Sequence, residues 1–123
     1  LYDMGGYFWQ EDIPGTLTGS NGTSIGSGAT NTSTIISSGA TSYPALACVS
    51  GPYNGYNDWV FPSMNEMYEI INNKSYYPSV DLSGTYWTST EYDSDNAYKC
   101  TTLGALISAN KQNIYNVFPI RYF

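Results

Sequence analysis

The clearest helical pattern in the chain lies between Ser63 and Asn73, where apolar residues recur at spacings of three and four. These apolar positions are Met64, Met67, Tyr68 and Ile71. Ser63, followed three residues later by Glu66, forms a capping box, in which each side chain accepts a hydrogen bond from the other residue's backbone amide. Asparagine tolerates the left-handed conformation that ends many helices. The sequence therefore predicts a helix of about ten residues that ends at Asn72 and Asn73.

After Gly84 the pattern changes to a period of two, which is typical of a half-buried strand. Residues 86–91 alternate in this way, and residues 97–102 and 116–122 are two further candidate strands, the last rich in Val, Phe, Ile and Tyr. Helical patterns come first along the chain and strands come later, a segregation that favours the α+β class. We expect two or three short helices and a small antiparallel sheet.

Residues 15–42 form a segment of low complexity, in which 22 of 28 residues are Gly, Ser, Thr or Asn and none is charged or aromatic. Composition alone would make this segment a flexible linker. Two local signals favour structure instead. Residues 30–32 are a candidate N-cap cluster ahead of Ile35, and Pro44 suits the first turn of a helix. We therefore expect one or two short helices in this part of the chain.

The length of 123 residues suits one domain, so we expect residues 1–123 to fold as a single unit that includes the 15–42 segment. Within residues 1–14, the aromatic cluster Tyr7-Phe8-Trp9 predicts a short strand anchored in the core before a turn at Pro14. No apolar run approaches the roughly 18 residues of a membrane span. The chain begins at Leu1 rather than Met, and we expect it to be a processed product or part of a longer protein.

Charge excludes several classes of function. The chain has four Lys or Arg residues, ten Asp or Glu and no His, and its net charge is −6. The four cations are scattered singly, whereas binding to nucleic acid or to an anionic membrane needs clustered Lys and Arg. Without His, there is no histidine general base and no histidine zinc ligand. We expect no enzymatic activity, no nucleic-acid partner and no membrane insertion, which leaves binding as the favoured kind of function.

The composition also favours recognition. Thirteen residues are Tyr, charged residues make up only 11% of the chain, and Ser, Thr, Asn and Gly are abundant. Tyrosine gives contact area at a low cost in conformational entropy, and small polar residues provide adaptable hydrogen bonds. Such side chains are typical of surfaces that bind other molecules.

Four segments in order resemble the Lcl C-terminal domain family, also known as DUF1566. Residues 55–67 read Gly-Tyr-Asn-Asp-Trp-Val-Phe-Pro-Ser-Met-Asn-Glu-Met, which resembles the family signature Gly-Tyr-x-Asp-Trp-x-Leu-Pro-Ser-x-x-Glu-Leu. Residues 86–92 are similar to its Tyr-Trp-Ser-Ser-Thr-Glu strand, residues 118–121 to its closing Arg-Pro-Val-Arg, and residues 25–32 to a stretch before its first helix. Phe118 stands where the closing motif has its first Arg, and the usual His-Gly-Leu strand is missing after Trp9.

The resemblance implies a C-type-lectin-like fold, which is also used by formylglycine-generating enzymes and by the variable proteins of diversity-generating retroelements. Members of the family lie at the ends of adhesins, surface proteins and phage fibres. The resemblance therefore implies a location outside the cell or on a virion surface. The cysteine pair that formylglycine-generating relatives use near the C-terminus is missing, which argues against that activity.

The densest acidic patch offers a candidate calcium site at Glu91, Asp93, Asp95 and Asn96. Oxygen ligands at alternate positions of a loop can hold Ca²⁺, although the patch is not a complete twelve-residue calcium loop. A solvated turn between two strands is the alternative interpretation, because Asp and Asn also favour turns. No other cofactor is indicated.

A candidate recognition surface combines the amide-rich segment near residue 110 with neighbouring tyrosines. Amides offer both donors and acceptors to a sugar or a peptide, and tyrosine rings provide contact area. The predicted ligand-binding residues are Tyr92, Tyr98, Asn110, Gln112, Asn113 and Tyr115. A polar hairpin loop that binds nothing is the alternative.

The two cysteines, Cys48 and Cys100, allow two interpretations. A disulfide between them would close a loop of about fifty residues and would stabilise the fold by about 3 to 4 kcal/mol in the chain-entropy model. Alternatively, both are buried thiols. A metal or redox role is disfavoured, because the chain has no Cys-x-x-Cys motif.

We therefore expect a non-catalytic binding domain, displayed on a phage fibre or adhesin, that recognises a glycan or protein of the host surface. One alternative is a structural decoration or fibre protein that binds only sister subunits, since a homo-oligomer is expected. Another is a variable protein of a diversity-generating retroelement.

Overall fold

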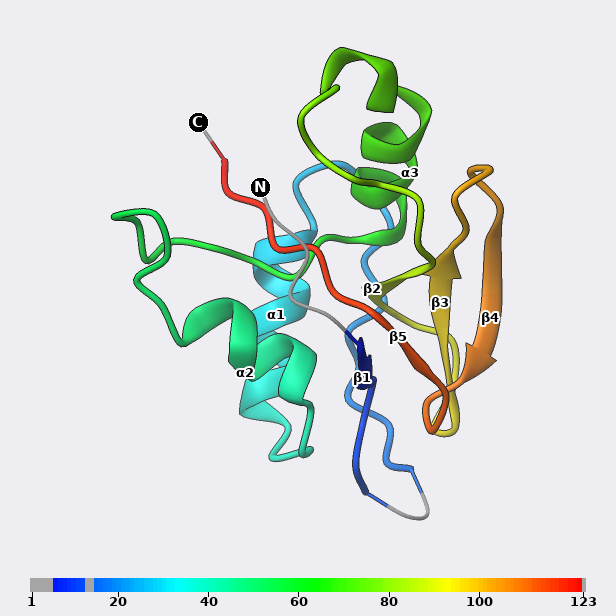
Figure 1. The fold of residues 1–123 in the computed structure, drawn as a ribbon. Helices are drawn as coiled ribbons and strands as arrows, with labels where there is room; N and C mark the ends of the chain where they lie inside the picture. The colour runs from blue at the N-terminus through cyan, green and yellow to red at the C-terminus, as the bar shows by residue number, and fades with distance from the viewer. Residues whose placement is uncertain (1–5, 13–14, 123) are drawn as a thin grey trace.

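The computed structural model describes residues 6–12 and 15–122. The described elements follow one another along the chain as shown in Figure 1. They are β1 (Gly6–Phe8), α1 (Gly28–Ser37), α2 (Tyr43–Val49), α3 (Met64–Asn72), the 3₁₀ turn η1 (Lys74–Tyr76), β2 (Tyr86–Glu91), β3 (Asn96–Cys100), β4 (Leu106–Asn110) and β5 (Ile114–Asn116). The α+β class and the presence of short helices are confirmed. Within the described residues, no helix is both long enough and apolar enough to cross a membrane.

The sheet is larger than expected and is mixed rather than antiparallel. Its five strands lie in the order β1-β5-β2-β3-β4. The pairs β1–β5, β2–β3 and β3–β4 are antiparallel, but β2 and β5 run parallel, with Tyr86 opposite Asn116. The prediction of a small antiparallel sheet is therefore wrong in both respects. A parallel pair joins strands that are distant in sequence, so local patterns do not reveal it.

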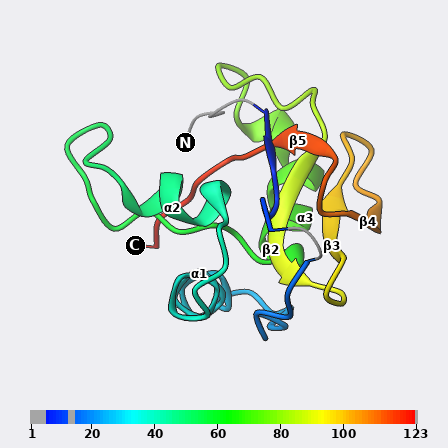
Figure 2. The same ribbon diagram turned by 90° about the horizontal axis from the view of Figure 1, so that it is seen from below.

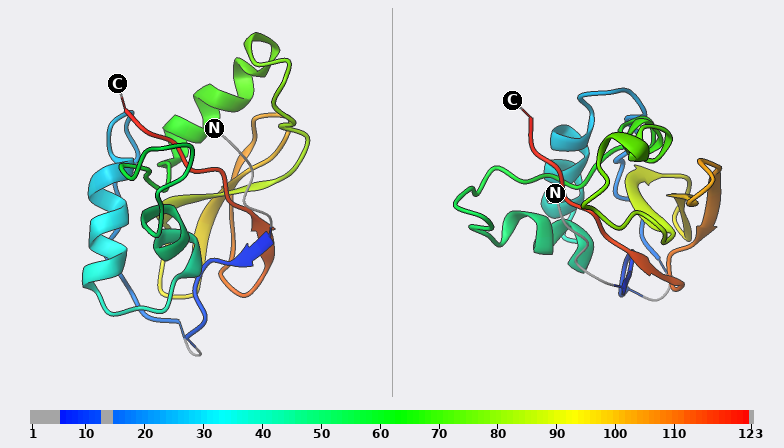
Figure 3. Two further views of the ribbon diagram at one scale, coloured as in Figure 1. Left: turned by 60° about the vertical axis from the view of Figure 1, so that its left-hand side comes forward. Right: turned by 45° about the horizontal axis from the view of Figure 1, so that its top comes forward.

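Helices cover both faces of the sheet, and the alternation along β2 explains how. Trp87 is fully buried in a cluster with residues of α1 and α2, whereas its neighbour Tyr86 is buried in a second cluster with residues of α3. Successive side chains of a strand point to opposite faces, so one strand supplies both clusters. Figures 1 and 2 show α1 and α2 on one side of the sheet and α3 on the other, and Figure 3 shows the same layers from two further directions.

Helix α3 begins as the sequence predicts. The Ser63 hydroxyl accepts a hydrogen bond from the Glu66 amide, and the Glu66 carboxylate accepts one from the Ser63 amide at 2.7 Å. The helix ends at Asn72, and the Asn73 amide donates to the Glu69 carbonyl at 3.1 Å. Both predicted ends of this helix are confirmed.

The low-complexity segment contains α1, and α2 follows it, which confirms the prediction of short helices. The N-cap prediction is wrong, because α1 begins at Gly28 and residues 30–32 lie inside it. Asn31 and Thr32 are buried there: Asn31 Nδ2 donates to the Gly22 carbonyl at 2.7 Å, and the Thr32 hydroxyl accepts from the Phe61 amide at 3.0 Å. These polar residues anchor the helix to the fold instead of capping it. Pro44 lies in the first turn of α2, as expected.

One strand prediction is wrong, and one strand was not predicted. Of residues 116–122, only Asn116 belongs to a regular strand, as the last residue of β5, and Ile120 forms one isolated bridge with Val60. Val117 and Phe118 are fully buried nonetheless, so core packing explains their apolar character. Strand β4 was not predicted. In the N-terminal region β1 confirms the expected strand, and Trp9 is fully buried, while Pro14 lies outside the described residues.

The two cysteines are free, buried thiols, so the disulfide interpretation does not hold in this structure. Cys48 belongs to the cluster on the α1–α2 side of the sheet, and Cys100 belongs to the cluster on the α3 side. Burial raises the pKa of Cys48 to about 12 and the pKa of Cys100 to about 11. Both groups are therefore neutral thiols near neutral pH.

Candidate functional site

The predicted recognition tyrosines do not form one surface. Tyr92 and Tyr98 pack edge to face, with ring centroids 5.5 Å apart. Tyr98 and Cys100 point to the same face of β3, and Cys100 is buried on the α3 side of the sheet. Tyr115 instead packs against Trp87, at 4.8 Å between centroids, and Trp87 is buried on the α1–α2 side. The sheet therefore separates Tyr115 from the other two tyrosines.

The amide-rich residues of the predicted surface mainly stabilise a turn. Asn110 Oδ1 accepts from the Gln112 amide at 2.8 Å, and Gln112 Nε2 donates to the Gln10 carbonyl at 2.8 Å. Asn113 Nδ2 donates to the Tyr115 hydroxyl at 3.3 Å. The Asn110 side chain thus closes the turn after β4, and the Gln112 side chain joins this turn to the N-terminal segment.

The residues of the predicted calcium site point in different directions. Asp93 Oδ1 accepts from the Asp95 amide at 2.9 Å and from the Asn96 amide at 2.8 Å, which is the geometry of a turn. The carboxylate of Glu91, in contrast, is buried and engaged elsewhere. Among residues 6–12 and 15–122, no group of three or more acidic, His or Cys side chains is arranged to hold a metal ion. The structure therefore does not bring the four predicted ligands together.

Glu91 forms a buried ion pair with Lys111, at 2.8 Å between Oε2 and Nζ, and both side chains are 2% exposed. Lys111 Nζ also donates to Gln10 Oε1 at 2.9 Å and lies 4.6 Å from the centre of the Trp9 ring. The other carboxylate oxygen of Glu91 accepts from the backbone amide of Gly19 at 2.9 Å. This ion pair connects β2, the turn after β4 and the N-terminal segment, so the centre of the predicted recognition loop is part of the core.

Glu66 is a second buried carboxylate, 4% exposed, that joins distant parts of the chain. Its Oε2 accepts from the Gly26 amide at 2.8 Å and from the Tyr122 hydroxyl at 2.6 Å. The Tyr122 hydroxyl in turn accepts from the Ala29 amide at 3.2 Å. Burial, followed by the hydrogen bond to Glu66, raises the pKa of Tyr122 to about 12.

The raised pKa of Tyr122 predicts a loss of stability in alkaline solution. The folded state holds the phenolic proton more tightly than the unfolded state does, so this contribution is complete below pH about 10 and disappears as the pH rises to about 12. The buried thiols act in the same direction. We expect the free energy of unfolding to fall less steeply over this range in Tyr122→Phe than in the parent chain. Denaturant unfolding at a series of pH values measures both slopes, and equal slopes would refute the assignment.

An aromatic pocket lies away from the predicted residues, between the loop before α3 and the C-terminal segment. Its volume is about 470 Å³, within the range of small-molecule sites. The lining residues are Asn54, Tyr56, Trp59, Ile70, Tyr77, Ile120 and Arg121, and we call it the Tyr56 pocket. Tyr56 is 50% exposed and Tyr77 is 38% exposed, whereas Trp59 is buried and donates from Nε1 to the Tyr56 carbonyl at 3.0 Å.

The charged group that lines the Tyr56 pocket is the guanidinium of Arg121, which forms a two-point ion pair with Asp58. Arg121 Nε lies 2.7 Å from Asp58 Oδ1, and Arg121 Nη2 lies 3.1 Å from Asp58 Oδ2. The guanidinium carbon also lies 3.6 Å from the centre of the Tyr56 ring. The guanidinium holds the pKa of Asp58 below its usual range, so the carboxylate is ionised near neutral pH. The Asp58 side chain remains 54% exposed and can accept hydrogen bonds from a ligand.

The sequence did not lead us to predict that Tyr56, Tyr77 and Arg121 lie in one site. None of these residues, nor the adjacent Asp58 and Trp59, was among the predicted ligand-binding residues, and Trp59 is buried. The available signal was that residues 55–67 and 118–121 both belong to the family-like motifs. The bridge between Val60 and Ile120 brings these two segments together.

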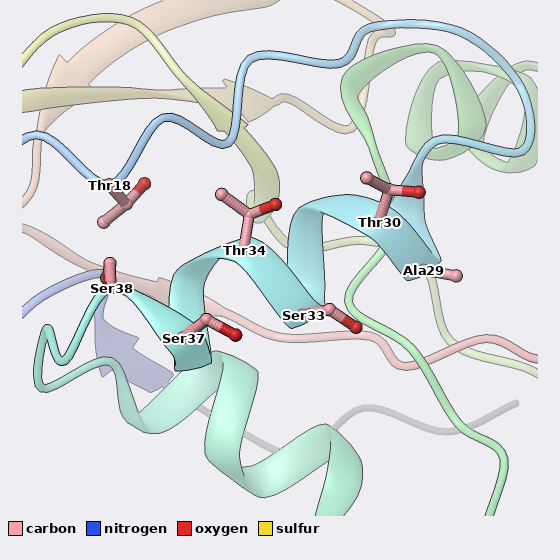
Figure 4. Close-up of a pocket in the computed structure, with 7 residues that line it drawn as sticks. All are labelled: Thr18, Ala29, Thr30, Ser33, Thr34, Ser37 and Ser38. Carbon is pink, nitrogen blue, oxygen red and sulfur yellow. The ribbon is translucent and has the colours of Figure 1, made fainter.

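A second depression lies along the outer side of α1 and has a volume of about 600 Å³. Figure 4 shows hydroxyl side chains of α1 lying along the helix below the segment that carries Thr18. Its lining residues are Thr18, Ala29, Thr30, Ser33, Thr34, Ser37 and Ser38. These groups can form hydrogen bonds, but they offer neither a charge nor an aromatic ring. The Tyr56 pocket is therefore the better candidate for a specific ligand.

Comparison with known proteins gives no relative from which a function could be inferred. No protein-family model, no curated protein and no solved structure matches this chain. The site is therefore assigned from its own geometry.

Proposed function

We propose that this chain is a non-catalytic recognition domain that binds a neutral sugar residue in the Tyr56 pocket. The observation that carries this proposal is that one pocket combines two partly exposed tyrosine rings with the guanidinium of Arg121, whose ion-pair partner Asp58 keeps an exposed carboxylate. The C–H face of a sugar ring packs on aromatic rings, and its hydroxyl groups bond to carboxylate, guanidinium and amide groups.

Charge supports a neutral ligand over an acidic one. Asp58 compensates the charge of Arg121, which lines the pocket, and the chain as a whole carries a net charge of −6. An anionic glycan would be repelled by the net negative charge of the chain. In the pocket it would meet Arg121, whose charge Asp58 already neutralises. The amide of Asn54, which also lines the pocket, offers a donor and an acceptor to uncharged hydroxyl groups.

The biological setting belongs to the same proposal. The resemblance of residues 55–67, 86–92 and 118–121 to the Lcl C-terminal domain family supports a C-type-lectin-like domain at the end of an adhesin or a phage fibre. Such a domain acts outside the cell or on the virion surface, where its partner is a glycan or glycoprotein of the host. A surface rich in Tyr, Ser and Asn and poor in charge is suited to that role.

A glycan array that includes neutral, sialylated and sulfated sugars tests the proposal. We expect binding to neutral glycans, and we expect Tyr56→Ala to weaken it by at least about tenfold, equivalent to about 1.4 kcal/mol. Tyr92→Ala is the matched control, because Tyr92 is 57% exposed in the β2–β3 turn. That turn and the loop that carries Tyr56 lie on opposite sides of the molecule in Figures 1 and 2.

Each pattern of loss has a distinct meaning. If Tyr56→Ala abolishes binding while Tyr92→Ala does not, the pocket is the site. If only Tyr92→Ala abolishes binding, the surface near Tyr92 and Tyr98 is the site and the pocket assignment is wrong. If the folded parent chain binds no sugar on the array, the proposed ligand class is wrong.

One observation favours a second candidate function, that of a structural subunit of a fibre or particle. Residues 13–57 contain no charged residue, and α2 exposes an apolar row at Tyr43, Leu46 and Val49. Uncharged surfaces with exposed apolar residues are common where protein subunits meet.

A variable protein of a diversity-generating retroelement would need a near-repeat of the coding region beside a reverse-transcriptase gene, which genome sequence can test.

A further inference from the structure

Strand β4 is an outer strand with an open edge. It is last in the sheet order and pairs with β3 along one side only, within the part of the chain that the structure describes. Figures 1 and 3 show it at the margin of the molecule. Ile107 is 48% exposed, and Ser108 and Asn110 are also exposed. An open edge presents backbone donors and acceptors that can pair with another strand.

The register of β4 identifies the groups that face outward. The Thr101 amide donates to the Ala105 carbonyl, and the Lys111 amide donates to the Asp95 carbonyl, at the two ends of the β3–β4 ladder. In an antiparallel ladder, every second residue of a strand exchanges backbone hydrogen bonds with the partner strand. On β4 the odd-numbered residues therefore bond to β3. The backbone groups of residues 106, 108 and 110 therefore point away from β3. Among these, the Asn110 carbonyl already accepts from Asn113 at 3.0 Å and has one lone pair left.

Strand β4 lacks two common protections against pairing. Proteins commonly guard an outer strand with a charged residue or a proline. Residues 100–110 contain neither, and Lys111, just beyond the strand, is buried in its ion pair with Glu91. The edge can thus accept a strand of another chain without burying a charge.

We propose that the edge of β4 binds β4 of a second copy of this chain, antiparallel and symmetric about Ser108, so that the two sheets become continuous. In this register Ser108 faces its own counterpart, and Ile107 lies opposite Ala109 of the other copy, a large side chain against a small one. Each copy carries a net charge of −6, and an uncharged edge brings no like charges into opposition. This surface is independent of the Tyr56 pocket.

Sedimentation velocity over a range of concentrations tests the proposal on the parent chain. We expect a monomer–dimer equilibrium within the range up to about 200 µM, and we expect Ser108→Pro to raise the dissociation constant by at least about tenfold. Proline at this position removes an outward N–H group and no bond to β3, so the fold should persist. Ser108→Thr keeps the N–H group and is the matched control, which should still form dimers.

Amide hydrogen exchange gives a second, independent measurement. In the dimer, the amides of Leu106, Ser108 and Asn110 should become protected as the concentration rises, whereas those of Ile107 and Ala109 should be protected at all concentrations. A parent chain that remains monomeric throughout the range would overturn the proposal. A dimer that survives Ser108→Pro with unprotected outward amides would also overturn it, because the contact would then lie elsewhere.

Discussion

Lys111→Met is expected to lower the free energy of unfolding by about 3 to 5 kcal/mol, because it leaves the buried carboxylate of Glu91 without its cation. The variant also loses the hydrogen bond from Nζ to Gln10 and the contact of the ammonium group with the Trp9 ring. A domain of this size is stable by only about 5 to 15 kcal/mol, so the loss is a large part of the total. Urea unfolding followed by tryptophan fluorescence measures it.

A double-mutant cycle separates the ion pair from other effects of the substitution. Glu91→Gln retains an oxygen that can accept from the amides of Thr18 and Gly19 but removes the charge. We expect Glu91→Gln with Lys111→Met to cost clearly less than the sum of the two single variants, because no charge is then left buried alone. Lys74→Met is the control for an exposed lysine, with an expected effect below about 1 kcal/mol. Additive losses would contradict a coupled ion pair.

The ion pair also explains why residues 15–20 are ordered despite a linker-like composition. The backbone amides of Thr18 and Gly19 donate to the Glu91 carboxylate, the Glu91 amide donates to the Ser20 carbonyl, and Lys111 Nζ donates to the Thr16 carbonyl. None of these interactions is local in sequence. Composition describes what a segment can do alone, whereas this segment is held by a carboxylate and an ammonium group more than seventy residues away.

Elements with local signals were predictable from the sequence. The capping box and the apolar spacing of α3 lie within one segment, and both ends of that helix were placed correctly. Strand β4 was missed because its five residues lack strict alternation and follow Gly104 closely. Residues 116–122 were mistaken for a strand because Val117 and Phe118 are apolar, although they are buried by packing without a ladder.

The candidate site was less predictable than the fold, because it depends on contacts between distant segments. The Tyr56 pocket draws residues from the loop before α3, from α3 itself, from the region after η1 and from the C-terminal segment. Sequence spacing alone cannot predict that Tyr56, Tyr77 and Arg121 lie close together. The predicted surface around residue 110 stays a prediction, but its polar composition did not reveal that Lys111, at its centre, is buried by partners distant in sequence.

Glu66→Ala is expected to lower the free energy of unfolding by roughly 3 to 5 kcal/mol, because three donors lose their acceptor at once. These are the amide of Ser63 at 2.7 Å, the amide of Gly26 at 2.8 Å and the hydroxyl of Tyr122 at 2.6 Å. The capping box of α3 disappears with them. The same denaturant titration measures the loss, and Glu69→Ala is the matched control, since Glu69 is exposed on the same helix.

Gly28→Ala tests the same cluster without removing the carboxylate. A Cβ atom at Gly28 would overlap Glu66 Oε1 and would lie 2.9 Å from the Phe61 carbonyl oxygen and 3.0 Å from the Tyr122 hydroxyl. Alanine normally stabilises a helix relative to glycine by about 1 kcal/mol, so a net loss of stability would show that the clash dominates. We expect a loss, and we expect it to be smaller in the Glu66→Ala background, where the overlap with the carboxylate is gone but the close contact with the Phe61 carbonyl oxygen remains. A Gly28→Ala variant that is as stable as the parent chain would mean that the carboxylate does not occupy this position.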